Sequence, residues 1–310
     1  MLLKFCVWIL KLTENAGKEY NTYIVKWFEK SRYEGKTMRN IIYAESAQLP
    51  ELEWYVGNKE IHLLRYYEPE PGIFIAESRN VIDIALRQGY EPLSVVCTEK
   101  MLKDELLDRV GDVPIYVVDP DAAKKEFGYV LTGGISCAMR RKKPSDYKEI
   151  LRDAKRIVVL EDVENPTNIG AIFRSAAAFG IDAVILSPAC VDPLYRRAMR
   201  VSVGNALLIP WAYMCYSEAQ WKEQGVNLLK QEGFETVAMA LREDNIRIDD
   251  PKLKQVDRLA IFMGNEGQGL AESTIQAVDH VAKIPMMNGV DSLNVAVAAG
   301  LAMWELGRRS

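Results

Sequence analysis

The chain has few of the residues that build metal centres or disulfide frameworks. Its 310 residues include only two histidines, His62 and His280, and five widely spaced cysteines without a C-x-x-C pair. Two histidines do not make a multi-histidine metal site, and an odd number of separated cysteines is typical of reduced thiols. We therefore expect no metal, no disulfide scaffold and a cytoplasmic location.

Long hydrophobic runs are also missing. The apolar opening stretch, residues 1–10, is interrupted by Lys4 and has half the length of a membrane-spanning helix. No small-residue cleavage pattern follows it, so we expect neither a signal peptide nor a membrane anchor. With 49% hydrophobic and 26% charged residues, the composition is that of a globular protein, and the length suggests two domains.

Positive charge is unevenly distributed, although the net charge is -4. Residues 138–200 contain twelve Lys and Arg against eight Asp and Glu, and residues 1–36 contain seven against four. A locally basic face can contact phosphates while an acidic remainder keeps the protein soluble. Charges on solvated helix faces would give the same counts, so both interpretations stay open at this point.

Predicted strands and helices alternate along most of the chain. This alternation predicts an α/β fold with mostly parallel sheets, in which ligands bind beyond the carboxyl ends of the strands. The basic stretch 140–144, which ends in proline, predicts a domain boundary. We therefore expect an extension over 1–37, a smaller α/β domain over 38–143 and a C-terminal domain over 144–310. The pattern predicts strands at 72–76, 94–97, 115–118, 157–160, 183–186, 236–240, 259–263 and 281–284, and helices at 79–87, 100–109, 168–179, 194–199, 218–231 and 293–306.

The first of three notable segments, residues 164–180, follows a predicted strand. On a helix that begins near Asn168, residues Ile169 and Phe173 share one side, and Arg174 lies about 140° from Ile169. Arg174 is therefore expected to point away from the packed side. A solubilising charge and a functional guanidinium both fit this position, and Asn168 also fits as a simple helix cap.

Two more segments follow predicted strands. Residues 262–270 contain three glycines and Glu266, in a spacing that matches neither a dinucleotide loop nor a triphosphate loop. Glycines let a backbone approach a ligand closely, and the embedded carboxylate is a candidate for orienting one. Residues 284–300 lead into a helix with Ser292 as the predicted N-cap. Its predicted apolar stripe consists of Leu293, Val297, Gly300, Leu301 and Trp304.

In this order, the three segments resemble the signature motifs of the SpoU (TrmH-type) RNA 2′-O-ribose methyltransferases of the SPOUT superfamily. The motifs are N-x-G-x-x-x-R before F-G, then G-N-E-x-x-G, then I-P-M followed by S-L-N-V, and the resemblance covers residues 157–306. Residues 74–77 and 131–136 also resemble the family's accessory substrate-binding domain. The chain departs from the family at Ser78 and Asn288, where glycine is usual.

The resemblance implies a knotted fold, a cofactor and a reaction. The fold would be an α/β sheet with a deep trefoil knot, and the protein a homodimer through the C-terminal domain, with both subunits contributing to each active site. The reaction would transfer a methyl group from S-adenosylmethionine to a ribose 2′-hydroxyl of RNA, with ribosomal RNA favoured over tRNA because an accessory domain suits a large structured target. The implied cofactor-binding residues are Gly264, Asn265, Gly267, Gly269, Leu270, Ile284, Met286, Ser292 and Leu293.

The resemblance also implies roles for individual side chains. Arg174 would stabilise the developing alkoxide and bind the adjacent phosphate, because a guanidinium is cationic under ordinary conditions. Glu266 would position Arg174 or the cofactor, and Asn168 would hold the ribose or phosphate. Ser292 and Asn294 would complete the catalytic pocket. The candidates for RNA phosphate contacts are Arg140, Arg141, Lys142, Lys143, Arg196, Arg197 and Arg200.

Three alternative functions remain open from the sequence. A knotted relative could methylate a base nitrogen of tRNA, although the S-L-N motif favours ribose. An RNA-binding relative without catalysis would have replaced Arg174, Glu266 or Asn294, and all three are present. A generic nucleotide-binding α/β enzyme would bind a dinucleotide or triphosphate in place of S-adenosylmethionine.

Overall fold

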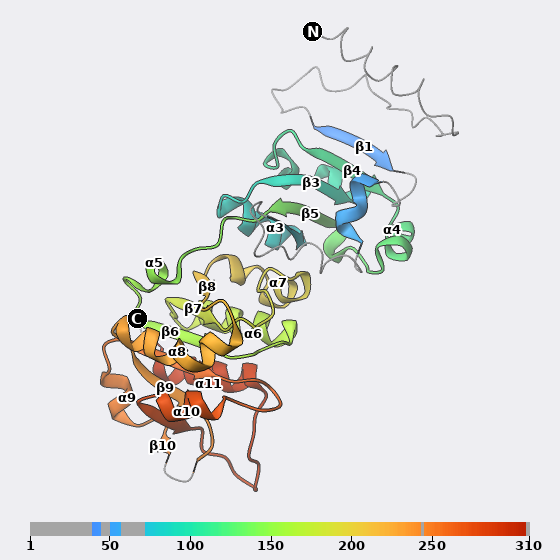
Figure 1. Ribbon diagram of the computed structural model, residues 1–310. Coiled ribbons are helices and arrows are strands. Elements are labelled where there is room, and N and C mark those ends of the chain that lie inside the picture. The colour runs from blue at the N-terminus through green and yellow to red at the C-terminus, as the bar shows by residue number, and fades with distance from the viewer. Residues whose placement is uncertain (1–38, 45–49, 57–71, 243–244, 308–310) are drawn as a thin grey trace.

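The computed structural model describes residues 39–44, 50–56, 72–242 and 245–307. The extension predicted for residues 1–37 lies outside this part of the chain, as do Cys6 and His62. The described residues form two α/β units, each built around one sheet, with the N-terminal unit above the C-terminal unit in Figure 1. Among the described helices, none combines the length and the apolar character needed to cross a membrane.

The N-terminal unit contains a five-stranded mixed sheet in the order β1-β4-β3-β5-β2. Strands β1, β4 and β3 are parallel, and β5 runs antiparallel to both β3 and β2. Apolar side chains of α3 and η4 pack on one face, and those of η1 and α4 pack on the other. The bounds are β1 Asn40–Ala44, η1 Pro50–Tyr55, β2 Ile73–Glu77, α3 Arg79–Arg87, β3 Pro92–Cys97, η3 Glu99–Lys103, η4 Glu105–Asp108, β4 Pro114–Val118, α4 Pro120–Phe127, η5 Thr132–Gly134 and β5 Ile135–Arg140.

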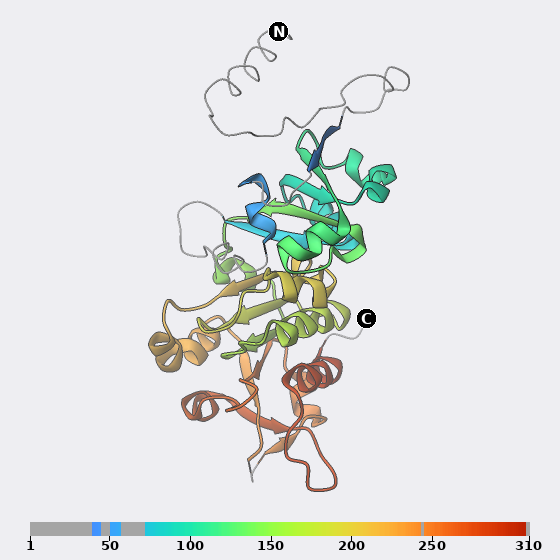
Figure 2. The same cartoon turned by 90° about the vertical axis from the view of Figure 1, so that its right-hand side faces the viewer.

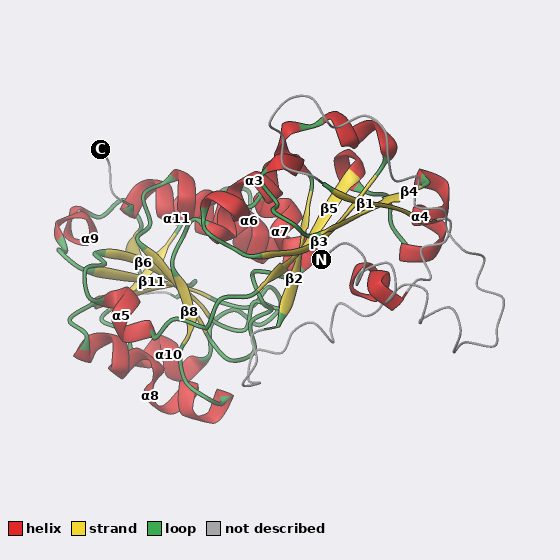
Figure 3. Cartoon of the chain, turned by 90° about the horizontal axis from the view of Figure 1, so that it is seen from above, coloured by secondary structure: helices red, strands yellow, loops and turns green. Residues whose placement is uncertain are grey.

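The C-terminal unit contains a parallel sheet of seven described strands in the order β10-β12-β9-β11-β6-β7-β8. Its central strands are continuous apolar runs, because helices cover both faces. Helices α6, α7, α9 and α11 pack on one face, and α5, α8 and α10 pack on the other (Figure 3). The bounds are α5 Tyr147–Leu151, β6 Arg156–Leu160, α6 Pro166–Ala178, β7 Ala183–Leu186, α7 Arg196–Ser202, η6 Asn205–Leu207, β8 Trp211–Tyr213, α8 Glu218–Gln231, β9 Glu235–Met239, β10 Ile246–Arg247, α9 Pro251–Gln255, β11 Leu259–Met263, α10 Glu272–Ala277, β12 His280–Lys283 and α11 Val295–Leu306.

The order of the strands reverses at β6. The chain first adds β7 and β8 on one side of β6, and the later strands β9, β11 and β12 lie on the other side. Crevices form outside the carboxyl ends of strands at such a reversal, because the connecting loops diverge there. The loops after β6, β11 and β12 are the three segments that the sequence singles out.

Helix α7 joins the two units. It packs against β2 of the N-terminal unit, in the region where the two units meet in Figure 2. One apolar cluster contains side chains of β2, α3, α7 and α6. Two ion pairs cross the same contact. The Arg141 guanidinium donates to both carboxylate oxygens of Asp192 at 2.7 and 3.0 Å, and Arg196 Nε lies 3.0 Å from Glu77 Oε1. The N-terminal unit is therefore fixed on the helix that borders the C-terminal site.

Most of the predicted elements are present, and one prediction is wrong. Residues 100–109 do not form a continuous helix, because the Asp104 side chain accepts a hydrogen bond from Leu106 N at 2.8 Å and starts a second 3-10 turn. The sequence analysis also misses the outer strands β1, β8 and β10 and the strand β5.

Candidate active site

Asn168, Glu266 and Asn294 meet at the carboxyl edge of the parallel sheet. Asn168 Nδ2 donates to Glu266 Oε1 at 2.7 Å, and Asn294 Nδ2 donates to Asn168 Oδ1 at 3.1 Å. These two hydrogen bonds join side chains that are 98 and 126 residues apart in sequence. The convergence of the three segments, which the sequence predicts, is present in the structure.

The cap of α11 fixes the orientation of this hydrogen-bonded chain. Asn294 Oδ1 accepts from Ala296 N and Val297 N at the first turn of α11. Its amide nitrogen therefore faces Asn168, which must accept with its oxygen and donate to Glu266 with its nitrogen. The prediction that Ser292 caps this helix is wrong, because Asn294 occupies that position and Ser292 lies exposed two residues earlier.

A different asparagine caps α6, and this leaves Asn168 available for the site. Asn165 Oδ1 accepts from Thr167 N at 2.9 Å, and Pro166 occupies the first turn, where a missing N–H does no harm. Asn168 lies in the same turn with its side chain 7% exposed. The helix begins two residues before the predicted start, and Asn168 is not its cap.

Arg174 does not belong to this network within the described chain. It is exposed on α6, as its angle to the packed side predicts. Six residues separate it from Asn168, which is about 240° around the helix and about 9 Å along it. The carboxylate of Glu266 bonds to Asn168 instead, so the expectation that Glu266 positions Arg174 is not met within one chain.

The glycine loop after β11 folds back on itself. A Cβ on Gly264 would lie 2.3 Å from the backbone of Gly269 and Leu270, so this position accepts only glycine. Asn265 shapes the turn, because its Oδ1 accepts from Gly267 N at 2.8 Å and its Nδ2 donates to Asp162 O at 2.8 Å. The Leu270 side chain is 7% exposed and packs in the core beneath the loop.

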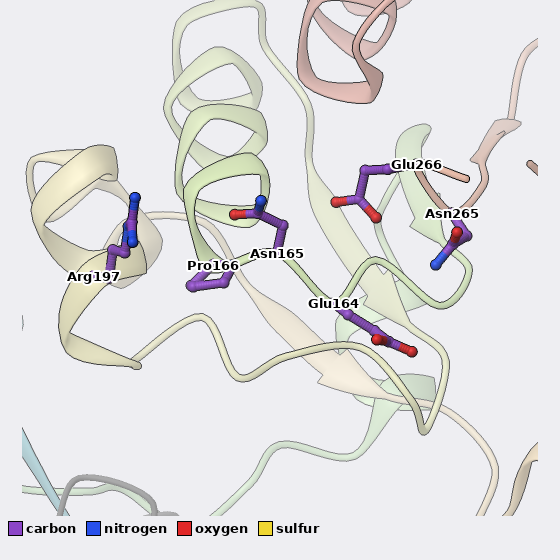
Figure 4. A pocket seen from close by; sticks show the side chains of 6 residues that line it. All are labelled: Glu164, Asn165, Pro166, Arg197, Asn265 and Glu266. Carbon is purple, nitrogen blue, oxygen red and sulfur yellow. The ribbon is translucent and has the colours of Figure 1, made fainter. Parts of the chain in front are cut away.

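An open hollow of about 450 Å³ lies beside this network. Figure 4 shows Glu164 and the start of α6 between Arg197 of α7 and residues 265–266 of the glycine loop. Arg197, predicted to bind phosphate, therefore lines the hollow that borders the site. The residues that line the hollow are Glu164, Asn165, Pro166, Arg197, Asn265 and Glu266.

The predicted phosphate-binding residues fall into two groups. Arg141 and Arg196 are used inside the protein, in the ion pairs with Asp192 and Glu77, and the Arg196 guanidinium also lies 3.6 Å from the centre of the Tyr129 ring. Phosphate contact is therefore the wrong assignment for these two. Arg140 pairs with Glu91 on the surface, and Lys142 lies over the Tyr90 ring. Lys143 is exposed, and Arg200 is half exposed.

The Cys190 thiol, beside the end of β6, is buried and inert. Burial is the largest cause that raises the pKa of Cys190 to about 12. Its Sγ lies 3.2 Å from Leu160 O and 3.4 Å from Val163 N. A thiol with this pKa does not supply a thiolate nucleophile at neutral pH. Among the residues that the structure describes, no group of three or more His, Cys, Asp and Glu side chains could hold a metal ion.

Glu161, the first residue after β6, was not predicted from the sequence. Glu161 is 2% exposed, and its carboxylate accepts hydrogen bonds from Trp221 on α8, from Ala271 and from Thr274 on α10. A polar residue directly after an apolar parallel strand is the signal that would have pointed to it, since ligand sites gather at that edge.

The C-terminal unit is a seven-stranded parallel sheet whose polar loops converge where the strand order reverses. This arrangement is typical of α/β enzymes that bind a ligand at that edge. Comparison with known proteins narrows this class. Residues 155–304 match the model of the SpoU rRNA Methylase family. A tRNA/rRNA methyltransferase of Mycobacterium bovis, described as uncharacterized, is 36% identical over 239 residues, which cover 76% of this chain and 81% of the relative. The chain therefore belongs to the SpoU methylase family.

Solved structures show the same fold. An AdoMet-bound rRNA methyltransferase from Sinorhizobium meliloti superposes with a TM-score of 0.71 at 20% identity, over 86% of this chain and 97% of that one. An RNA 2′-O ribose methyltransferase superposes with a TM-score of 0.63 at 24% identity, over 87% of this chain and 98% of that one. Both alignments extend well beyond the C-terminal unit, so the N-terminal unit shares in the likeness.

Proposed function

We propose that the protein transfers the methyl group of S-adenosylmethionine to a ribose 2′-hydroxyl of RNA, with ribosomal RNA as the substrate. The hydrogen-bonded chain Asn168–Glu266–Asn294 carries this proposal, because it joins the three family motifs at one edge of the sheet. Membership of the SpoU family and the rRNA methyltransferases among its structural neighbours support it.

The glycine loop and the segment before α11 fit the proposed cofactor. Residues 265–269 are wholly or partly exposed, and the loop folds so tightly over Gly264 that no side chain would fit there. Such a loop offers backbone N–H and C=O groups to an adenosine, and the partly exposed Ile284, Met286 and Leu293 offer apolar contacts. When bound, the cofactor supplies an activated methyl group. The chain has to hold it in place and align the attacking oxygen with it.

Asn168 and Glu266 would hold the RNA ribose beside the cofactor. Glu266 is exposed, lines the hollow and uses Oε1 for Asn168, so Oε2 would serve as the acceptor for a ribose hydroxyl. Arg197 and Arg200 of α7, together with Lys143, would contact phosphates on the side of the N-terminal unit.

The required guanidinium would come from a second copy of the chain. Arg174 is exposed on a side of α6 away from the Asn168 network, and α11 beside it carries an exposed apolar stripe. Val297, Leu301 and Trp304 are 53%, 43% and 59% exposed. The apolar stripe that the sequence predicts thus faces outward in one chain, and a homodimer would cover it. Arg174 of the partner subunit would then stabilise the 2′-oxygen as its proton is lost.

The C-terminal segment returns to the start of its unit, as a knotted chain requires. Asn294 bonds to Asn168 near the start of α6, and Arg156 Nε at the start of β6 donates to Leu306 O at 3.0 Å. The segment 264–294 also lies against residues 161–162 through Asn265 and Ala271. These contacts support the proposal that the chain forms the trefoil knot of the family.

Methyl transfer from labelled S-adenosylmethionine to total RNA tests the reaction. After complete digestion to nucleosides, the label is expected in a 2′-O-methylated nucleoside of ribosomal RNA. Label on a base nitrogen would refute ribose specificity, and no transfer to any RNA would refute the activity itself.

Mixed dimers test the contribution of two subunits. Arg174→Ala and Asn168→Ala chains are each expected to be inactive alone. After subunit exchange, mixed dimers should have one complete site and recover about a quarter of the wild-type activity, since half of the dimers are mixed and each has one intact site of two. If mixing restores no activity while both variants remain dimeric, Arg174 does not act across the interface.

A further inference from the structure

Glu161 is a deeply buried carboxylate at the carboxyl edge of the sheet. It follows β6 directly and is 2% exposed. Its side chain does not face the hollow. It points toward α8 and the start of α10, where it bonds to three residues of two segments that lie far from it in sequence.

Three hydrogen bonds occupy both carboxylate oxygens. Ala271 N donates to Oε1 at 2.6 Å, and Trp221 Nε1 and Thr274 Oγ1 donate to Oε2 at 2.7 and 2.6 Å. All three donors are neutral. Burying a carboxylate without such donors would be strongly unfavourable, so these three bonds stabilise the side chain in its buried position.

These bonds anchor one end of the glycine loop, and the backbone of the same strand anchors the other end. Glu161 N donates to Met263 O at 2.9 Å, immediately before the loop. Asn265 Nδ2 donates to Asp162 O at 2.8 Å inside it. Ala271, which bonds to the Glu161 carboxylate, is the first residue after the loop. Residues 161–162 thus hold the loop at its start and at its end.

We propose that Glu161 is a positioning residue that holds the glycine loop in the conformation that binds S-adenosylmethionine. The inference rests on the proposed assignment of residues 264–270 to the cofactor. The carboxylate holds Ala271, from which α10 also starts, so its loss would release the end of the loop while the sheet stays intact. Two acceptor oxygens are required, because a glutamine has only one and would turn an N–H group toward one of the three donors.

The direct test is the affinity of the full-length Glu161→Gln variant for S-adenosylmethionine, measured by titration calorimetry. We expect the Kd to rise about tenfold or more, because the substitution removes one hydrogen bond and brings two donors together in a buried position next to the loop. The affinity for substrate RNA should stay within about twofold of wild type, because the hollow and the exposed cations do not contact Glu161.

Asp279→Asn is the matched control. Asp279 also accepts three bonds, from Thr236 N, Thr236 Oγ1 and Lys230 Nζ, but it lies before β12 at the opposite edge of the same sheet. It should lower the unfolding temperature while leaving the Kd for S-adenosylmethionine within about twofold of wild type. If Asp279→Asn weakens cofactor binding as much as Glu161→Gln does, the effect is one of general stability and the proposal fails.

Thr274→Val provides a second variant in case Glu161→Gln does not fold. It keeps the shape of the side chain and removes one of the three donors, and we expect the Kd to rise about threefold. Unchanged cofactor affinity in every folded variant would overturn the proposal. A wild-type protein that does not bind S-adenosylmethionine at all would instead refute the proposed function, so the two failures are distinguishable.

Discussion

The two sheets use their polar side chains in different ways. In the parallel C-terminal sheet, polar side chains at the carboxyl edge bond to one another and still keep exposed atoms, as Glu266 does. In the mixed N-terminal sheet, antiparallel β2 and β5 bring Glu77 opposite Ser136, and both are buried against the C-terminal unit. The carboxyl ends of parallel strands all lie at the same edge of a sheet, whereas those of an antiparallel pair lie at opposite edges.

The two units differ in what their polar residues bind. The buried charged residues of the N-terminal unit, Glu77 and Arg141, form ion pairs with Arg196 on α7 and with Asp192, which precedes α7. Helix α7 in turn packs closely on α6, since a Cβ on Gly170 would lie 2.5 Å from Ala198 O. The N-terminal unit therefore sets the position of the exposed arginines of α7, while the C-terminal edge holds the Asn168–Glu266–Asn294 network.

The largest effect is expected at the C-terminal edge. Under the proposed function, Arg174→Ala should lower kcat about 10²- to 10³-fold, because the charge proposed to stabilise the developing oxyanion would be lost, and it should leave the Kd for S-adenosylmethionine within about twofold. Steady-state methyl transfer and cofactor titration measure the two effects. Arg87→Ala, an exposed helical arginine of the N-terminal unit, is the control and should retain full kcat. Comparable kcat values for the two variants would remove the functional contrast between the sheets.

The second effect concerns stability at the contact between the units. Asp192→Asn leaves the buried Arg141 without its counter-charge and should lower the free energy of unfolding by about 3 kcal/mol or more. Urea denaturation measures it. Glu91→Gln breaks an exposed arginine pair, with Arg140, and should change the same quantity by less than about 1 kcal/mol. Equal losses would mean that burial does not distinguish the two pairs.

Long apolar strands were predictable from sequence, and the choice among neighbouring polar residues was not. Strands β6 and β11 are continuous apolar runs, a pattern that buried parallel strands require. Asn165 and Asn168 both suit a helix start, as do Ser292 and Asn294. The structure uses Asn165 and Asn294 as caps, and Asn294 also bonds across the site to Asn168. That distinction depends on contacts between distant segments, which local sequence does not contain.

The roles of the basic residues were equally ambiguous in sequence. Arg196 and Arg197 are adjacent, yet α7 turns the first toward Glu77 and the second toward the hollow. Adjacent residues lie about 100° apart on a helix, so one basic run serves two surfaces. Which arginine faces which surface depends on the packing of α7 between the units. The motif spacing identified the family but did not contain this information.

A third prediction uses a strained residue of the N-terminal unit. Ser78 has φ 74° and ψ 154°, a conformation almost restricted to glycine, and glycine is usual at this position in the family that the sequence resembles. Ser78→Gly should therefore raise the free energy of unfolding by about 1 kcal/mol, after the added entropy of the unfolded chain is subtracted. Asn288→Gly is the control, because asparagine tolerates φ 57°. Equal gains in thermal denaturation would show that Ser78 is not specially strained.

The smallest effect is a pH dependence that comes from a buried carboxyl group of the N-terminal sheet, Glu77. Burial, the largest cause, raises the pKa of Glu77 above its ordinary value of 4.5, although Arg196 and Arg200 act in the opposite direction. Between 4.5 and the raised pKa, the folded chain binds more protons at Glu77 than the unfolded chain does. The stability contributed by this group is therefore fully present below pH 4.5 and is lost as the pH rises through the folded pKa.

Glu77→Gln isolates this contribution from those of the other carboxyl groups. The difference in unfolding free energy between wild type and variant should decrease steadily from about pH 4.5 toward neutral pH, since glutamine does not titrate. Carboxylates with a lowered pKa, such as Asp279, change stability in the opposite direction but cancel in the difference. A difference that grows with pH would mean that the ion pair with Arg196 outweighs burial. Glu77 would then favour its charged form, as the exposed carboxylates do, and the proposed contrast between the two sheets would not extend to their charges.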